Sequence, residues 1–271
     1  INNAKTLIDI GSNKGQFILI TNIFFPNVDV HSFEPQTDEL NLQKKILNLK
    51  NIKYYNFALG NCEKTSNLYI TKRKDSSSLL KPEISGSTTY QIQKVKKIIV
   101  KKLDNIKQLQ GIKRPVILKL DVQGFELEVL KGSLETLNLV DHIITEVSFA
   151  KVYKDQVMKD EIFDFLYSKS FYLNMKCNLS KINGKPFQQD VLFSKKISNK
   201  WFFKMKIGII IKGRSWTFQL ANSLNKSGNL YKLITTYPKF YLNKYNVPLN
   251  KTNSVFFLYI NGIEVGEWVN E

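Results

Sequence analysis

The segment that most constrains the fold covers residues 6–16, Thr-Leu-Ile-Asp-Ile-Gly-Ser-Asn-Lys-Gly-Gln. Its apolar residues predict a buried strand. The glycines at 11 and 15 predict a tight turn into a helix, because glycine adopts positive φ without a Cβ clash. The first N–H groups of such a helix point at any ligand above the turn. A second apolar run ends in an acid, Glu34, 19 residues after Gly15. Together these features predict the nucleoside-binding end of an α/β domain.

The spacing of the glycines bears on the kind of nucleoside. The segment reads Asp-x-Gly-x-x-x-Gly, whereas dinucleotide folds carry G-x-G-x-x-G. Asp9 inside the strand end would repel a pyrophosphate and suits a cationic ligand such as S-adenosylmethionine. Glu34 can accept hydrogen bonds from both ribose hydroxyls and would reject a 2′-phosphate. A nicotinamide cofactor, or an ordinary α/β loop with Glu34 as a solvated acid, remains open on this pattern alone.

Further motifs make a resemblance to a known family specific. Residues 117–132 read Ile-Leu-Lys-Leu-Asp-Val-Gln-Gly-Phe-Glu-Leu-Glu-Val-Leu-Lys-Gly. With the glycine loop, Phe33-Glu34-Pro35 and Ala58-Leu59-Gly60, these motifs occur in order and resemble the FkbM-type methyltransferases over about residues 4 to 195. The resemblance implies a class I methyltransferase fold, S-adenosylmethionine as cofactor, and O-methylation, often of sugars or secondary metabolites.

The resemblance also implies roles for individual residues. It assigns cofactor binding to Asp9, Gly11, Asn13, Gly15 and Gln16 in the loop, to Glu34 at the ribose and to Ala58 beside the adenine. The motif Lys-x-Asp-x-x-Gly-x-Glu near the reaction centre is matched by Asp121, Gly124 and Glu126.

The catalytic hypothesis rests on where the acids fall along the predicted strands. Open α/β sheets bind ligands at the carboxyl ends of their strands. Asp121 ends one strand, next to a glycine that keeps the backbone open, and Glu146 lies inside another. We expect Asp121 to act as a base or a metal ligand, with Glu146 or Glu126 as the second candidate; whether a divalent metal takes part is left undetermined. The competing interpretations are that Asp121 caps the next helix and that Glu126 is a surface or helix-start acid.

The amino-acid composition limits which kinds of binding partner the chain is expected to have. The formal net charge is +17, but only three of the 40 basic residues are arginine, the usual residue for bidentate phosphate contacts. Solvated lysine faces are therefore expected, a nucleic-acid partner is disfavoured, and an anionic glycan or lipid-linked phosphate stays open. Two cysteines without metal-type spacing predict free thiols in a reducing, cytoplasmic setting. No apolar run is long enough to span a bilayer, although the aromatic segment 200–204 could be a linker or a peripheral membrane contact.

Alternating strand and helix patterns predict a Rossmann-like α/β fold, with a mostly parallel sheet and helices on both faces. An antiparallel last hairpin is expected from strands 171–175 and 191–194, with Asn183-Gly184 as a turn between flanking segments. Strands 66–71 and 95–100 predict a paired ribbon, and the polar loop 72–90 between them is a lid, a binding segment or disordered. The other predicted elements are strands 6–10, 28–33, 52–57, 116–120 and 143–147, and helices 15–24, 38–49, 125–131 and 161–168.

Residues 1–197 are predicted to form this methyltransferase domain, followed by a linker at 198–204 and a partial second α/β unit at 205–271. That unit reads as strand 206–211, a glycine loop, helix 217–224 and strand 231–235. It resembles the beginning of a GT-B glycosyltransferase, and the rival interpretation is a small appendage.

The sequence therefore predicts a methyltransferase that acts on a hydroxyl of a sugar or glycan, in a chain fused to a glycosyltransferase. An RNA methyltransferase and a non-catalytic scaffold with a cofactor fold are the alternatives.

Overall fold

The computed structural model describes residues 3–47, 49–83, 88–177 and 179–195, together with the backbone of four strands beyond residue 206. The chain divides into two compact units, one of residues 3–197 and one of residues 198–271 with residues 1–2. The predicted linker at 198–204, with its aromatic segment, and the predicted helix at 217–224 lie outside the described residues.

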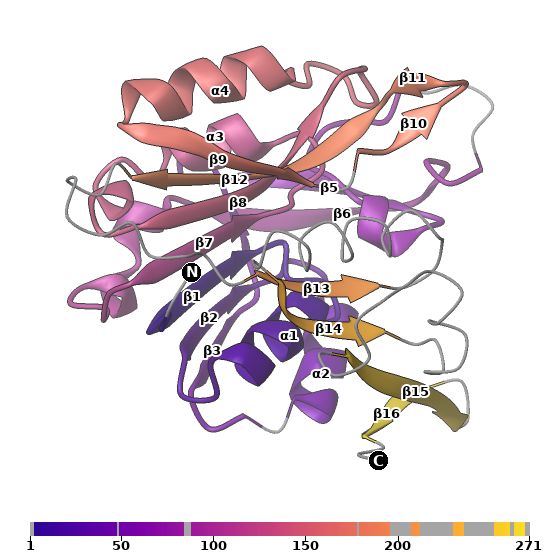
Figure 1. The fold of residues 1–271 in the computed structure, drawn as a ribbon. Coiled ribbons are helices and arrows are strands. Elements are labelled where there is room, and N and C mark those ends of the chain that lie inside the picture. Colours follow the sequence, from indigo (N-terminus) through magenta and orange to yellow (C-terminus); the bar gives the residue numbers. More distant parts are fainter. Residues whose placement is uncertain are drawn as a thin grey trace. The chain divides into compact units, whose positions relative to one another are not determined.

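The first unit is built on a seven-stranded sheet with the order β3-β2-β1-β7-β8-β12-β9 (Figure 1). The first five strands in this order are parallel, and β12 runs antiparallel to both β8 and β9. This mostly parallel sheet with an antiparallel last hairpin confirms the predicted fold class. The strands are β1 (Thr6–Ile10), β2 (Asp29–Phe33), β3 (Ile52–Tyr55), β7 (Val116–Leu120), β8 (His142–Ser148), β9 (Phe171–Cys177) and β12 (Gln188–Lys195).

Among the described residues, four helices follow strands of this sheet along the chain. They are α1 (Gln16–Phe24) after β1, α2 (Thr37–Ile46) after β2, α3 (Glu126–Lys131) after β7 and α4 (Lys159–Ser168) after β8. Figure 1 shows α1 and α2 beside the β1–β2–β3 end of the sheet, and α3 and α4 toward the end that carries β9. The predicted strand 52–57 is shorter than expected and ends at Tyr55. Just beyond the strand, Asn56 Nδ2 donates to the main-chain carbonyl of Glu34 at 2.9 Å.

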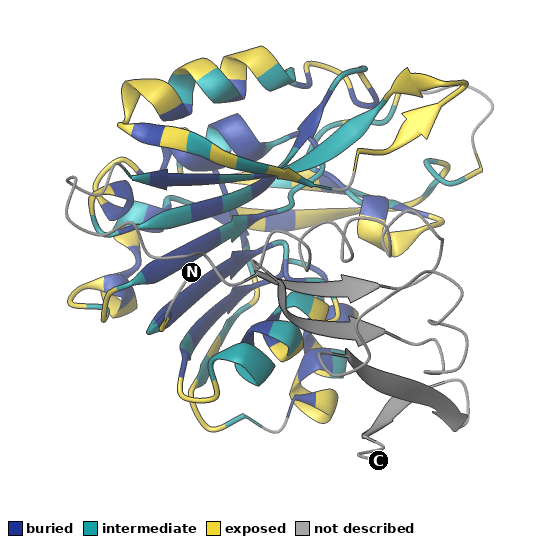
Figure 2. Ribbon diagram, in the orientation of Figure 1, coloured by how far each residue is buried: buried dark blue, intermediate teal, exposed yellow. Residues whose placement is uncertain are grey.

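The core lies on the central strands, which are dark along their length in Figure 2. In β1, all five residues are buried, and Leu7 and Ile8 are wholly inaccessible. Strands covered on both faces are expected to be continuously apolar, and each buried Leu or Ile contributes about 1.5–3 kcal/mol. Lys119 in β7 breaks this pattern, since its four strand neighbours are buried and apolar.

A smaller sheet has the order β4-β6-β5. It consists of β4 (Ala58–Leu59), β5 (Lys64–Thr71) and β6 (Ile92–Lys101), and the antiparallel pairing of β5 with β6 confirms the predicted ribbon. The turn predicted at Asn183-Gly184 joins β10 (Lys181–Ile182) to β11 (Lys185–Pro186). Both turn residues have positive φ, 49° and 76°, as a two-residue type I′ turn requires. The 3₁₀ helices are η1 (Lys74–Ser76), η2 (Leu103–Asn105), η3 (Lys107–Leu109) and η4 (Thr136–Asn138).

In the second unit, four strands form a sheet with the order β13-β14-β15-β16: β13 (Ile207–Ile211), β14 (Leu230–Thr235), β15 (Thr252–Ile260) and β16 (Ile263–Trp268). The first three are parallel and β16 is antiparallel to β15. Both strands predicted in this region are present. No helix among the described residues is long and apolar enough to cross a bilayer.

Candidate active site

The loop between β1 and α1 depends on glycine at two positions. Gly11 and Gly15 have φ values of +74° and +81°, which side chains disfavour. A Cβ on Gly11 would overlap the main-chain carbonyl of Asp121, and a Cβ on Gly15 would come within 2.6 Å of Leu47 Cδ1. The loop therefore packs directly on the end of β7. Gln16 begins α1 and is exposed to solvent.

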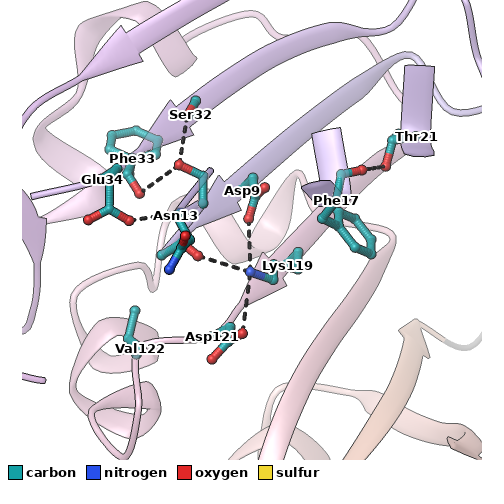
Figure 3. Close-up of polar contacts among 12 residues, drawn as sticks. Asp9, Asn13, Phe17, Thr21, Ser32, Phe33, Glu34, Lys119, Asp121 and Val122 are labelled. Carbon is teal, nitrogen blue, oxygen red and sulfur yellow. Dashed lines mark hydrogen bonds and ion pairs between the residues drawn. The ribbon is translucent and has the colours of Figure 1, made fainter. Parts of the chain in front are cut away.

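Glu34 follows β2 and turns toward this loop (Figure 3). Its Oε2 accepts a hydrogen bond from the Asn13 N–H at 2.8 Å, and its Oε1 accepts one from the Gln36 N–H at 2.8 Å. The residue is only 3% exposed, and burial raises the pKa of its carboxyl to about 7 against the opposing effect of the two N–H donors. Each carboxylate oxygen accepts about two hydrogen bonds, so both oxygens keep one acceptor position.

The ammonium group of Lys119 lies between the carboxylates of Asp9 and Asp121 (Figure 3). Its Nζ lies 3.2 Å from Asp9 Oδ1 and 3.7 Å from Asp121 Oδ2, and it donates to the Gly11 carbonyl at 3.0 Å. Burial alone would lower the pKa of Lys119, but the negative charges of Asp9 and Asp121 outweigh it and raise this pKa above its ordinary value. Lys119 is therefore a cation that joins the ends of β1 and β7.

Asp9 is wholly buried, and burial raises the pKa of its carboxyl against the attraction of Lys119. Among the described residues, neither of its oxygens has a hydrogen-bond partner with acceptable geometry; the 3.2 Å approach of Lys119 is an ion pair. Buried carboxylate oxygens normally accept hydrogen bonds, so Asp9 keeps acceptor capacity beside the glycine loop between β1 and α1. Lys119 is the lysine of the motif that carries Asp121, Gly124 and Glu126, but the sequence prediction assigned it no role, although a lysine inside a buried apolar strand was a visible signal.

Gln43 of α2 is a second residue that sequence reasoning missed. It is completely buried, its Nε2 donates to Ser12 Oγ at 2.8 Å and to the Asn13 carbonyl, and its Oε1 accepts from Ser32 Oγ at 2.8 Å. These bonds hold the middle of the loop to the end of β2. A glutamine in a polar stretch of helix gives no sequence signal for this role.

The turn after β7 carries the predicted catalytic acid. The Asp121 side chain is 41% exposed, and its Oδ1 accepts a hydrogen bond from Gln123 Nε2 at 2.7 Å. Glu126 is buried, and its Oε1 accepts from the main-chain N–H groups of Val122 and Gly124, at 3.1 Å each. Burial raises the pKa of Glu126 to about 7. Phe125, and not Asp121, occupies the N-cap position of α3, and the Glu126 carboxylate is directed back into the turn.

Glu146, in β8, lies close enough to Asp121 for their charges to interact. Its Oε2 accepts a hydrogen bond from Gln188 Nε2 at 2.6 Å, and Asp190 is its register partner on β12. Burial first, and then the negative charges of Asp121 and Asp190, raise the pKa of Glu146 to about 9. Burial and these charges therefore favour the protonated form of Glu146.

The remaining predicted residue, Ala58, packs in an apolar cluster of the small sheet with Leu68, Ile98 and Val100. Its side chain is 8% exposed. Within the described part of the chain, no three His, Cys, Asp or Glu side chains are arranged to hold a metal ion.

The first part of the polar segment predicted at 72–90 is anchored across the carboxyl edge of the sheet. Gln36 Nε2 donates to the Lys74 carbonyl at 3.1 Å, Ser78 Oγ donates to the Gln123 carbonyl at 2.7 Å, and Tyr153 Oη donates to the Ser76 carbonyl at 2.7 Å. Residues 74–78 thus contact the connections after β2, β7 and β8. The interpretation of this segment as a lid stays a prediction.

The sheet order with its antiparallel β12, and the glycine loop between β1 and α1, define a Rossmann-like, class I methyltransferase fold. The model of the methyltransferase FkbM domain matches residues 9–173, which is more than half of the chain. The chain belongs to the FkbM methyltransferase family, a family of S-adenosylmethionine-dependent enzymes.

Three solved structures with a similar fold are distant in sequence. A methyltransferase FkbM from Methylobacillus flagellatus KT is 13% identical with a TM-score of 0.45, over 70% of this chain and 43% of that chain. This chain therefore spans less than half the length of that protein. A putative S-adenosylmethionine-dependent methyltransferase from Listeria monocytogenes is 10% identical with a TM-score of 0.43, over 72% and 92% of the two chains. Magnesium protoporphyrin IX methyltransferase from Synechocystis PCC 6803, with bound SAM, is 8% identical with a TM-score of 0.41, over 72% and 71%. No curated protein matches the chain.

Proposed function

We propose that this chain is an O-methyltransferase that transfers the methyl group of S-adenosylmethionine to a hydroxyl of a sugar or glycan. The observation that carries this proposal is the position of Asp121. It is a half-exposed carboxylate at the carboxyl end of β7, oriented by Gln123 and in contact through its main chain with the Gly11 turn.

The residues at the sheet edge fit S-adenosylmethionine. Asp9 has buried oxygens without hydrogen-bond partners among the described residues, which suits an ammonium or sulfonium ligand close by. Glu34 keeps an acceptor position on each oxygen, as a ribose diol requires. In this proposal Gly11, Asn13, Gly15 and Gln16 form the loop beneath the cofactor, and Ala58 contributes backbone near the adenine.

S-adenosylmethionine supplies an electrophilic methyl group, and the residues of the chain supply orientation and proton removal. Correct orientation of two reactants lowers a barrier by about 7–11 kcal/mol in favourable cases. We assign the base to Asp121. Glu146, whose protonated form is favoured by burial and by the neighbouring negative charges, is assigned a hydrogen-bond donor role toward the acceptor. Glu126 holds the turn through its two backbone hydrogen bonds.

A glycan acceptor is supported by the family resemblance and by carboxyl groups, which are good partners for sugar hydroxyls. The second unit is proposed to be the start of a GT-B-like glycosyltransferase, supported by the parallel pairing of β13, β14 and β15. An RNA acceptor is the alternative drawn from the net charge, and the scarcity of arginine disfavours it. The proposed location is the cytoplasm.

The test uses the full chain with S-adenosylmethionine labelled in the methyl group. Transfer is measured to a panel of p-nitrophenyl glycosides and, in parallel, to transfer RNA. Label on a glycoside supports the proposal, whereas label on RNA alone contradicts the proposed sugar acceptor. If calorimetry finds no binding of S-adenosylmethionine, the proposal that the chain is a methyltransferase with this cofactor is wrong.

The role of Asp121 is tested with D121N against the exposed control D160N. Loss of a general base lowers kcat by about 10²–10⁴-fold. D121N is expected to show this loss while it binds S-adenosylmethionine normally. Wild-type turnover by D121N would exclude the base role.

A further inference from the structure

Gln123 occupies a position that is costly for its residue type. Its φ is +55°, in the left-handed region that glycine or asparagine adopts more easily, and it is followed by Gly124 at +94°. Such a conformation persists only where surrounding contacts enforce it, and it is more frequent at functional sites. Here three hydrogen bonds fix the residue. Its main-chain carbonyl accepts from Ser78 Oγ. In its side chain, Nε2 donates to Asp121 and Oε1 accepts from Tyr153 Oη at 3.0 Å.

This chain of contacts has one hydrogen-bond donor too few for its acceptors. The Tyr153 hydroxyl lies 2.7 Å from the Ser76 carbonyl and 3.0 Å from Gln123 Oε1, and both of those oxygens are acceptors. A tyrosine hydroxyl carries one hydrogen, so it can donate fully to only one of them. While Asp121 is ionised, Gln123 must keep its NH₂ group toward the carboxylate and its oxygen toward Tyr153.

A proton on Asp121 removes this conflict. If the side-chain amide of Gln123 rotates by half a turn, protonated Asp121 can donate to the amide oxygen Oε1. The amide NH₂ group then donates to the Tyr153 oxygen. The Tyr153 hydrogen is left for the Ser76 carbonyl alone. Each of the three contacts then joins one donor to one acceptor.

We propose that Gln123 is a positioning residue for methyl transfer, which holds the Asp121 carboxylate before the reaction and reverses its amide when Asp121 takes the acceptor's proton. This inference rests on the proposed role of Asp121 as base. In the step it serves, the acceptor O–H bond breaks and its proton passes to Asp121. The acceptor oxygen bonds to the methyl carbon as the carbon–sulfur electron pair stays on sulfur.

The same contacts tie the segment at residues 74–78 to the acid, since Tyr153 is completely buried and bridges the Ser76 carbonyl to Gln123. A displaced segment would therefore free the Gln123 amide and loosen Asp121. The charged and titratable groups that act on Asp121 from the neighbouring elements are Asp9 of β1, Lys119 of β7, Glu126 of α3, Glu146 of β8 and Tyr153 after β8.

The first test is independent of cofactor and acceptor. The side-chain amide of Gln123 is followed by ¹⁵N NMR across pH in the full chain, with its signals assigned by their loss in Q123M. They are expected to move with pH in the wild type and to move clearly less in D121N, where only neighbours such as Glu126 and Glu146 still titrate, while the exposed Gln110 serves as an internal control. Signals that do not move in the wild type, or that move equally in D121N, overturn the inference.

The second test separates kcat from KM, with the p-nitrophenyl glycoside of highest wild-type turnover as acceptor. Misplacement of a reacting group by about 1 Å costs on the order of 100-fold, so Q123M should lose about 10- to 100-fold in kcat with little change in KM for S-adenosylmethionine. Q123E should recover part of this loss at low pH, where its neutral acid can donate to Asp121. The control Q110M should behave as the wild type.

The outcomes distinguish this inference from the function on which it rests. If D121N loses turnover while Q123M keeps it, the base assignment stands and the positioning role of Gln123 is wrong. If D121N itself turns over normally, the base assignment fails, whatever the Gln123 variants do.

Discussion

Gly11 and Asp121 contact each other through their main chains, since the Cα of Gly11 faces the Asp121 carbonyl and the Asp121 N–H donates to the Ile10 carbonyl at 3.0 Å. The proposed cofactor loop and the turn that carries the proposed base therefore form one packed unit. A shift in either turn is transmitted to the other without any intermediate side chain.

The first prediction isolates this contact by comparing two glycines in the same backbone conformation. Gly11 and Gly111 have φ values of +74° and +73°, but nothing lies within 4 Å of a Cβ built on Gly111. G111A should cost only the left-handed penalty of about 1–2 kcal/mol. G11A adds a steric overlap with backbone and should cost about 4 kcal/mol or more in urea unfolding. Equal losses would show that the contact with Asp121 is unimportant.

The second prediction concerns the ion pair between Lys119 and Asp9. K119M leaves a completely buried carboxylate without its cation, a loss of about 3–5 kcal/mol in stability. In a D9N background the same substitution should cost clearly less, with a coupling energy of about 2 kcal/mol in a double-mutant cycle. K131M, which removes a solvent-exposed pair with Glu128, is the control and should cost about 0–1 kcal/mol. Additive effects of K119M and D9N would contradict the pairing.

The third prediction is a pH dependence that originates at Glu146. Its pKa is about 9 in the folded chain and about 4.5 in the unfolded chain, so folding takes up a proton between these values. The wild type should therefore lose stability relative to E146Q as pH rises through this window, and the difference should level off above about pH 9. Urea unfolding of both proteins from about pH 5 to about pH 9 measures it. E135Q, at an exposed position, should show no such trend, and a parallel pH profile for E146Q and the wild type would refute the assignment.

The fourth prediction tests the support beneath the cofactor loop. Q43M keeps the length of the side chain but removes its bonds to Ser12, Asn13 and Ser32, and each buried polar group left unpaired costs about 1–3 kcal/mol. Calorimetry should show S-adenosylmethionine binding weakened by about tenfold, since about 1.4 kcal/mol corresponds to one decade. The exposed control Q108M should bind normally. Unchanged affinity in Q43M would mean that the loop is held by its glycines alone.

Much of the fold follows from local patterns. Apolar runs that end in an acid mark the strands that meet at one sheet edge, and this pattern predicts Glu34 and Asp121 at the same edge, on the two strands that flank β1. The hairpin turn at Asn183-Gly184 was predictable because its residue types suit positive φ at two consecutive positions.

The contacts that shape the site depend on residues far apart in the chain. Lys119 reaches Gly11 across 108 positions, Gln43 reaches the loop across 30, and Tyr153 reaches Gln123 across 30. The periodicity of apolar residues cannot predict such partners. A single polar residue in a strand or helix gives the same sequence pattern whether its side chain contacts solvent or a distant loop. Glu126 shows the same limit, since only the fold reveals that its carboxylate holds the turn.

The position of β12 has a consequence for how this domain matures on the ribosome. Among the described strands, β9 pairs only with β12, and β12 is the last strand of the unit to be synthesised. Until residues 188–195 emerge, β9 has no sheet neighbour and β8 presents an open edge, the kind of surface that invites pairing with other chains. Completion of the sheet is thus postponed to the end of translation of this unit, and a nascent chain that stalls before β12 is a candidate for chaperone capture.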